Sequence, residues 1–323
     1  MLSPLAELTT LPPPAQLLFQ SPVQRLPKNR MSKSPTWLLE HSRNDYSQYG
    51  EDGIIEQVLG LLPSLDHWCV EFGAWDGQYL SNTYRLTESC NYSAVLIEGS
   101  ADRAEALKTK YANSSRIFPV NAFVGYSADD NLDSILAKTP LPRNFDLLSI
   151  DIDGNDYHVW QASTAYTPKV VVIEFNSTVP TDADFIQRAA PDISQGCGLK
   201  PLVSLGKAKG YELVCVTLGN AIFVRAEYFD RFDITDNRPE TLRSDTSNVT
   251  WLLSTFDGNV ILRGSRRMPW HGLHIRESRV QQMPACFRQY PHNFSRLKSA
   301  AFKIYKKYWN SRARRERKRN AAR

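Results

Sequence analysis

The chain has 323 residues, of which 42% are hydrophobic and 11% aromatic, enough to bury a sizeable core. It contains no apolar run of the roughly 18 to 20 residues that crosses a bilayer, and its N-terminus lacks the basic start and apolar stretch of a signal peptide. Five widely spaced cysteines without a C-x-x-C pair indicate neither a disulfide framework nor a zinc site. We therefore expect a cytoplasmic, globular protein.

Both ends of the chain differ from its body. Residues 1–35 are rich in proline and show no periodicity, so we expect them to be disordered. Residues 294–323 contain twelve Lys or Arg and one Glu, a net charge of +11 in a chain whose total is +5, so the remaining residues carry a net charge of −6. Such a basic tail is suited to an anionic membrane surface, as a peripheral contact, or to nucleic acid, although a merely solvated tail is the commoner explanation.

Between the two ends, apolar runs alternate with amphipathic stretches. A helix is predicted over 51–62, and further helices over 82–88, 102–111, 131–138, 156–162 and 199–210. Strands are predicted over 68–72, 94–98, 117–121, 147–150 and 170–175. Strand and helix alternate with connections too long for hairpins, which predicts an α/β fold with a mostly parallel sheet flanked by helices. Two closely spaced strands, 211–216 and 221–224, predict an antiparallel hairpin at one edge.

The pattern divides the chain into four parts. After the N-terminal segment 1–35, the α/β domain is assigned to 36–225 and a small, polar, turn-rich extension to 226–293. The basic tail, 294–323, begins with a stretch (299–309) that has the spacing of an amphipathic basic helix.

The first strand runs into a glycine-containing turn, Glu71 to Gly77, with the pattern E-x-G-x-x-x-G. Gly73 and Gly77 let the backbone approach a ligand beyond the carboxyl end of the strand. The glycine spacing differs from the G-x-G-x-x-G of dinucleotide turns, and the G-K-[ST] of phosphate loops is absent. By itself this pattern also fits an ordinary tight turn. As a ligand turn, it places Ala74 and Asp76 among the cofactor-binding candidates.

The second strand ends in Glu98, 21 residues after Gly77. An acidic side chain at this place can accept hydrogen bonds from both ribose hydroxyls of a nucleotide. The two features together favour an adenosyl ligand. Asn121, at the end of the third strand, is a candidate for contact with the adenine, and a turn-forming asparagine is the alternative.

The fourth strand leads into three carboxylates within six residues, Asp151, Asp153 and Asp156. Like charges so close together raise a pKa or attract a cation, so all three are candidate ligands for Mg²⁺. Asp156 equally suits the N-terminus of the next helix. Glu174, at the end of the fifth strand, is expected beside Asp151 and Asp153, because neighbouring parallel strands end at one edge.

Five segments together resemble the FkbM-type class I methyltransferases: SQYGEDGIIEQVL (47–59), VEFGAWDG (70–77), IEG (97–99), LLSIDIDGNDYHVW (147–160) and VVIEFN (171–176). The resemblance extends over about residues 47–224 and implies a Rossmann-like, seven-stranded sheet with S-adenosyl-L-methionine as methyl donor. It also implies O-methylation of a small molecule or saccharide, with Glu71, Gly73 and Gly77 at the donor turn and Glu98 on the ribose. Many relatives have Asp-x-Glu-Gly where this chain has Asp151-Ile152-Asp153-Gly154.

Methyl transfer to a hydroxyl requires that a proton leave the acceptor, and Asp151, Asp153 and His158 are the candidate bases. Two alternatives stay open. The first is a sugar transferase, because Asp151-Ile152-Asp153 is also a DxD pattern, with which such enzymes hold a metal and a sugar diphosphate. The second is a non-catalytic nucleotide-binding module anchored by its basic tail. Residues 178–200 and the pair Trp270 and His271 are candidates for covering the acceptor.

Overall fold

The computed structural model describes residues 33–321, with side chains to residue 319, so nearly all of the segment predicted to be disordered lies outside the described residues. The strands of the main sheet are β1 Trp68–Phe72, β2 Ser93–Glu98, β3 Ile117–Asn121, β4 Leu147–Ile150, β5 Val170–Glu174, β6 Tyr211–Val216 and β7 Asn220–Arg225. Its helices are η1 Trp37–His41, α1 Glu51–Gly60, α2 Tyr84–Ser89, α3 Ala101–Lys110, α4 Leu132–Leu136, α5 Asp156–Ala162, α6 Leu199–Ala208, η2 Ala226–Phe232 and α7 Pro239–Leu242. None of the described helices is long and apolar enough to cross a membrane.

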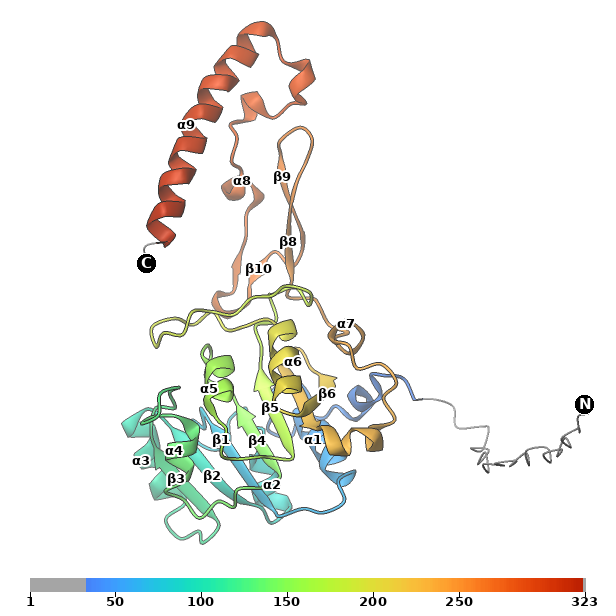
Figure 1. The fold of residues 1–323 in the computed structure, drawn as a ribbon, viewed down its shortest axis with the longest axis vertical. Coiled ribbons are helices and arrows are strands. Elements are labelled where there is room, and N and C mark those ends of the chain that lie inside the picture. The colour runs from blue at the N-terminus through green and yellow to red at the C-terminus, as the bar shows by residue number, and fades with distance from the viewer. Residues whose placement is uncertain (1–32, 322–323) are drawn as a thin grey trace, which may run out of the picture. The chain divides into compact units, whose positions relative to one another are not determined.

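The main sheet has seven strands in the order β3-β2-β1-β4-β5-β7-β6, with helices along it (Figure 1). Every pair from β3 to β5 is parallel, and β7 pairs antiparallel with both β5 and β6. This is the predicted Rossmann-like sheet, mostly parallel with a hairpin at one edge. The hairpin folds back so that β7, the later strand, lies between β5 and β6.

The central strands are mostly apolar, with the buried Glu71 of β1 and Ser149 of β4 as polar exceptions, because both faces of a parallel sheet are covered. Val170 to Ile173 of β5 have no exposed surface, and Trp160 of α5 packs on Phe223 of β7 with ring centroids 5.2 Å apart. Phe232 and Leu242 are buried in the same core, so the packing of the sheet continues past residue 225. The division into domains at that residue stays a prediction.

Several helices end earlier than predicted. Helix α4 covers only 132–136, and it begins after Asn131 because the side chain of that residue caps it, accepting the backbone N–H of Ser134. The 3-10 helix η1 was not predicted at all. It buries Trp37, whose indole N–H donates to the carbonyl oxygen of Phe232 at 2.9 Å, a contact between residues far apart in sequence.

The C-terminal extension contains the strands β8 Thr250–Ser254, β9 Val260–Gly264, β10 Arg267–Met268 and β11 Leu273–His274. It also contains the helices η3 Pro269–His271, α8 Glu277–Val280, η4 Ala285–Phe287, η5 Pro291–Asn293 and α9 Arg296–Ala321. Strands β8 and β9 form a hairpin around the turn Asp257-Gly258-Asn259. The predicted amphipathic helix lies within α9, which is longer than the sequence pattern indicated.

Candidate functional site at the carboxyl edge of the sheet

A row of paired residues brings four strand ends to one place. Across β2, β1, β4 and β5 the register aligns Ile97, Phe72, Ile150 and Ile173. The next residue of each strand therefore emerges at the same edge of the sheet, in the order Glu98, Gly73, Asp151 and Glu174. A cavity of about 990 Å³ lies there and all four line it. This volume is at the upper end of the range for small-molecule sites, and the location is where open α/β sheets bind ligands.

The predicted glycine turn is built against β4. Gly73 has a φ of +77°, and a Cβ at this position would lie 2.0 Å from the carbonyl oxygen of Asp151. Only glycine fits, because the backbones of the two neighbouring strand ends touch. Gly77, with a φ of +70°, packs instead on Leu96 and Leu107, and its N–H donates to the carbonyl of Ala74 at 2.6 Å. The turn thus closes between the sheet and α3, leaving Gly73 at the cavity wall.

Glu71 and Asp76 organise this turn from outside the cavity. The buried Glu71 carboxylate accepts hydrogen bonds from the hydroxyls of Ser81 and Thr83, at 2.6 and 2.7 Å, and from the backbone N–H of Asn82. Burial raises its pKa. Asp76 is exposed and accepts the backbone N–H groups that follow it in the turn. Neither residue lines the cavity, so the structure places both behind the donor-binding position predicted for them.

Glu98 lines the cavity in a fixed orientation. One carboxylate oxygen accepts the backbone N–H of Trp75 at 2.9 Å and the other accepts that of Ser100 at 2.8 Å. Each oxygen keeps a lone pair for a further donor. Asn121 does not line the cavity. Its amide donates to the carbonyl oxygen of Glu98 at 2.9 Å, so it braces the end of β2.

Asp151, Asp153 and Glu174 lie together at the cavity wall, with one oxygen of each within 4.8 Å of the others. Because the carboxyl groups of Asp151 and Glu174 lie so close together, a proton on one of them reduces their mutual repulsion. Burial among protein atoms, and then the charges of Asp156, Asp153 and Glu71, raise the pKa of Asp151 to about 8. Burial and the charge of Asp151 raise the pKa of Glu174 as well. This convergence is the one expected of neighbouring parallel strands, which end at one edge of the sheet.

Asp153 has a φ of 56°, the left-handed conformation that a residue with a side chain seldom adopts. Trp75 and Leu80, with φ of 50° and 54°, share this conformation and also line the cavity. Backbone strain of this kind is maintained by the surrounding structure and gathers at functional sites.

Asp156 holds the Asp153 loop in its shape and is not one of the three clustered carboxylates. Its two oxygens accept the backbone N–H groups of Ile152 and Gly154, each at 2.9 Å. Burial raises the pKa of Asp156, while these two hydrogen bonds oppose the rise. Glu174, and not the buried Asp156, therefore joins Asp151 and Asp153 in the group of converging carboxylates that could hold a metal.

His158, a candidate base, lies on α5 away from the cavity wall. Its Nε2 is 2.8 Å from the carbonyl oxygen of Gln187, so this nitrogen carries the proton and donates it. The residue thus ties α5 to the segment that follows β5. In this arrangement it does not reach the carboxylate cluster.

Aromatic and basic side chains that the sequence analysis did not select also line the cavity. Phe123 is 80% exposed, and its ring lies over Gly99, where a Cβ would be 2.7 Å from the ring. Trp75 is stacked by the guanidinium of Arg103, 3.4 Å from its ring centroid. The pKa of Tyr49 is raised by burial and by the charge of Glu174. Trp75 and Phe123 have a sequence signal, since each is an aromatic residue shortly after a strand end, whereas Tyr49 precedes α1 and has none.

A smaller hollow of about 390 Å³ adjoins the carboxylates Asp153 and Glu174. Gln195 and Gly196, which follow β5, line it together with Trp270 and His271 of the extension. These are segments that the sequence analysis selected to cover an acceptor, and the structure brings them together. Thr178 is not among the residues lining it, and its hydroxyl donates to Asn176 at 2.6 Å.

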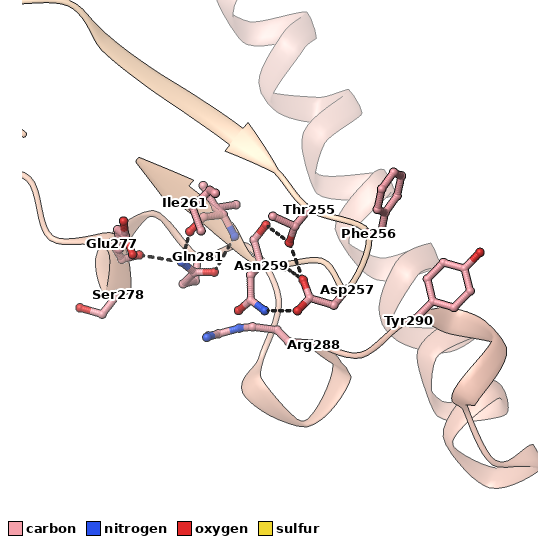
Figure 2. A pocket seen from close by; sticks show the side chains of 11 residues that line it. Thr255, Phe256, Asp257, Asn259, Ile261, Glu277, Ser278, Gln281, Arg288 and Tyr290 are labelled. Atoms are coloured by element: carbon pink, nitrogen blue, oxygen red, sulfur yellow. Dashed lines mark hydrogen bonds between the residues drawn. The ribbon is translucent and has the colours of Figure 1, made fainter. Parts of the chain in front are cut away.

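A third hollow, of about 970 Å³, lies wholly within the extension (Figure 2). Its polar groups bind one another. Asp257 accepts hydrogen bonds from the side chains of Thr255 and Asn259, and the amide of Gln281 donates to the carbonyl of Val260 at 2.6 Å (Figure 2). With these groups already paired, this hollow has no cluster of free polar groups like that at the sheet edge.

No protein-family profile matches the chain, and no curated protein matches it. Solved structures similar to it include the CurJ carbon methyltransferase, with 11% identity over 54% of this chain and 52% of that chain, and a TM-score of 0.37. The citrinin polyketide synthase CMeT domain has 14% identity over 54% of this chain and 51% of that chain, with a TM-score of 0.38. The N-terminal domain of EvdMO1, in the presence of SAH and D-fucose, has 10% identity over 58% of this chain and 91% of that domain, with a TM-score of 0.36. The chain thus spans about half the length of the first two.

Proposed function

We propose that the protein is an S-adenosyl-L-methionine-dependent methyltransferase of the FkbM type that methylates a hydroxyl group of a small molecule or saccharide. The observation that carries the proposal is Glu98, held by two backbone N–H groups so that its carboxylate faces a cavity at the end of β2. A carboxylate at this place suits the two hydroxyls of a ribose. The resemblance of residues 47–224 to that family supports the same assignment.

The surroundings of Glu98 fit the rest of an adenosyl donor. Phe123 offers an exposed ring next to Gly99, on which an adenine can stack. On the other side, Gly73 brings backbone close to the cavity without a side chain. A donor with its ribose on Glu98 would extend along this turn, from β2 toward β4. Its reactive methyl group would then point toward the clustered carboxylates.

Asp151, Asp153 and Glu174 fit the proton transfer that O-methylation requires. In this step the acceptor oxygen forms a bond to the methyl carbon, the carbon–sulfur bond breaks, and the sulfonium becomes a neutral thioether. The hydroxyl proton passes to a carboxylate of the cluster. A base works best when its pKa is near the working pH, and a pKa of about 8 for Asp151 meets this condition. Holding the reactants in line supplies several kcal/mol more.

The same three carboxylates suit Mg²⁺, a hard cation that takes oxygen ligands. Asp151, Asp153 and Glu174 would hold the ion, which would supply positive charge that lowers the pKa of the acceptor hydroxyl. Binding would be visible without activity, because the ion relieves repulsion in the folded state. At pH 8, millimolar Mg²⁺ should raise the unfolding temperature of the native protein and leave that of Asp151→Asn unchanged. Equal shifts in both would contradict a site at this cluster.

Calorimetry separates the proposal from its rivals. S-adenosylhomocysteine should bind the native protein, whereas a nucleotide sugar such as UDP-glucose should not. Glu98→Gln should weaken binding at least tenfold, because a hydrogen bond to a charged group contributes about 1.5 to 3 kcal/mol. The matched control is Glu105→Gln, an exposed glutamate on α3 that pairs with Lys108 and does not line the cavity. Binding of UDP-glucose in place of S-adenosylhomocysteine would favour the sugar transferase instead.

A further inference from the structure

The helix α9 is attached to the extension through one side only. Its Phe302 and Tyr305 pack on Phe287, with ring centroids 5.4 and 5.3 Å apart, and the Tyr305 hydroxyl donates to the carbonyl of Gln282 at 2.6 Å. Phe294 adds a further ring contact to Phe302. These contacts fix the first half of the helix and determine which of its faces stays open.

An apolar stripe is left on the open face. Leu297, Ile304 and Tyr308 are 86%, 74% and 54% exposed. Their spacings of seven and four residues place them on one side of an α-helix, and Ala301 lies between them. Exposed aliphatic side chains in a row are unusual on a water-facing helix and indicate a surface that becomes buried.

Positive charge accompanies the stripe. At roughly 100° per residue, Lys306 falls opposite Leu297, whereas Lys303 and Lys307 lie on the flank between Lys306 and the stripe. The last turns add a dense group of cations, Arg312, Arg314, Arg315, Arg317, Lys318 and Arg319. Over Arg296–Ala321 there are eleven Lys or Arg and one Glu. None of the α9 cations whose side chains are described forms an ion pair with a carboxylate.

We infer that α9 is an interfacial helix that binds an anionic lipid bilayer, with the stripe of Leu297, Ile304 and Tyr308 inserted below the headgroups. A helix with an apolar stripe flanked and opposed by lysines is the arrangement that lies flat in a membrane interface. The unpaired cations of the last turns are attracted to the negative surface of such a bilayer. Because this inference rests on α9 alone, it stands or falls independently of the proposed methyl transfer.

Other occupants of this face fit less well. A nucleic acid would account for the cations and leave the aliphatic stripe in water. A second copy of α9 would cover the stripe, but would bring two helices of net charge +10 against each other. An anionic bilayer satisfies both the stripe and the charge.

The test is cosedimentation of the full chain with vesicles. The native protein should pellet with vesicles of 70% phosphatidylcholine and 30% phosphatidylserine, and at least tenfold less with phosphatidylcholine alone. Raising the salt to 0.5 M should release it, because the Debye length shortens to a few ångströms. Failure to pellet with anionic vesicles at low salt would overturn the inference, and so would equal binding to both vesicle types.

Two pairs of variants assign the binding to the stripe. The double variant Leu297→Gln, Ile304→Gln should bind at least tenfold more weakly, since each buried aliphatic side chain contributes about a factor of ten or more. Glutamine keeps the helix, which circular dichroism can verify. The matched control is Leu252→Gln, Leu253→Gln in β8, where both leucines are exposed. Equal loss in the control would overturn the assignment to α9. Unchanged vesicle binding in the α9 variant would do the same. A native protein that binds single-stranded RNA and no vesicle would instead identify nucleic acid as the ligand.

Discussion

The carboxylate cluster makes the stability of the protein depend on pH in an unusual direction. The pKa of Asp151 is about 8 in the folded protein, against an ordinary value of 3.8. Between pH 3.8 and about pH 8, the folded state therefore holds a proton on Asp151 that the unfolded chain has lost. Stability falls as the pH rises through this window, and the loss is complete above about pH 8. Replacing Asp151 by Asn removes the titrating group, so the variant should gain stability relative to the native protein as the pH rises.

The size of the gain follows from the shift. Each pKa unit corresponds to about 1.4 kcal/mol. The Asp151 carboxylate faces the open cavity, however, so solvent screens much of the repulsion and we expect about 1 to 2 kcal/mol. Urea unfolding at pH 5 and pH 9 measures it: the free energy of unfolding of Asp151→Asn relative to the native protein should be higher at pH 9 by that amount.

A second aspartate provides the control. Partial burial raises the pKa of Asp76, but the hydrogen bonds from the backbone N–H groups of Tyr79 and Gln78 outweigh it, so the pKa is lowered overall. Such a group contributes stability above its ordinary pKa and loses it only as the pH falls through the lower value. The effect of Asp76→Asn should therefore be the same at pH 5 and pH 9. A difference for Asp151→Asn no larger than that for Asp76→Asn would refute the reasoning about the proton on Asp151.

Three further predictions concern the cavity. Gly73→Ala should lower the free energy of unfolding, measured with urea, by about 2 to 4 kcal/mol, because its Cβ would meet a backbone oxygen at 2.0 Å in a left-handed conformation. The control Gly60→Ala, which has open space around it, should be neutral or stabilising. Asp153→Asn should abolish methyl transfer and leave the calorimetric affinity for S-adenosylhomocysteine largely unchanged. Phe123→Ala should weaken that affinity about tenfold through lost stacking, and Phe256→Ala, which changes an exposed phenylalanine outside the cavity, should not.

The sheet could be predicted because its signals are local. The apolar runs of β1, β3, β4 and β6 have the bounds that the sequence indicated, and the parallel orientation of the strands follows from the long connections between them. The same orientation explains why Glu174, on β5, could be expected beside Asp151. Where the position of a side chain follows from the end of a strand, the sequence is enough.

Other features depend on contacts that a single sequence does not reveal. Glu71 and Asp156 have the residue type expected of ligand-binding groups, but nearby backbone N–H groups and hydroxyls occupy their oxygens. The orientation of His158 is set by the carbonyl of Gln187, 29 residues away. Phe123 gains its place from the missing side chain of Gly99 on a neighbouring strand end. Each of these depends on how loops meet in space, which periodicity does not encode.

The most direct test of the proposed function is transfer of label from S-adenosyl-L-methionine carrying a radioactive methyl group. The native protein is incubated with this donor and fractionated cell extract, alongside Glu98→Gln and Asp153→Asn. We predict that label appears in a small-molecule or saccharide fraction with the native protein and that both variants reduce it strongly. A native protein that binds the donor and labels no fraction, or variants that label as well as the native protein does, would contradict the assignment.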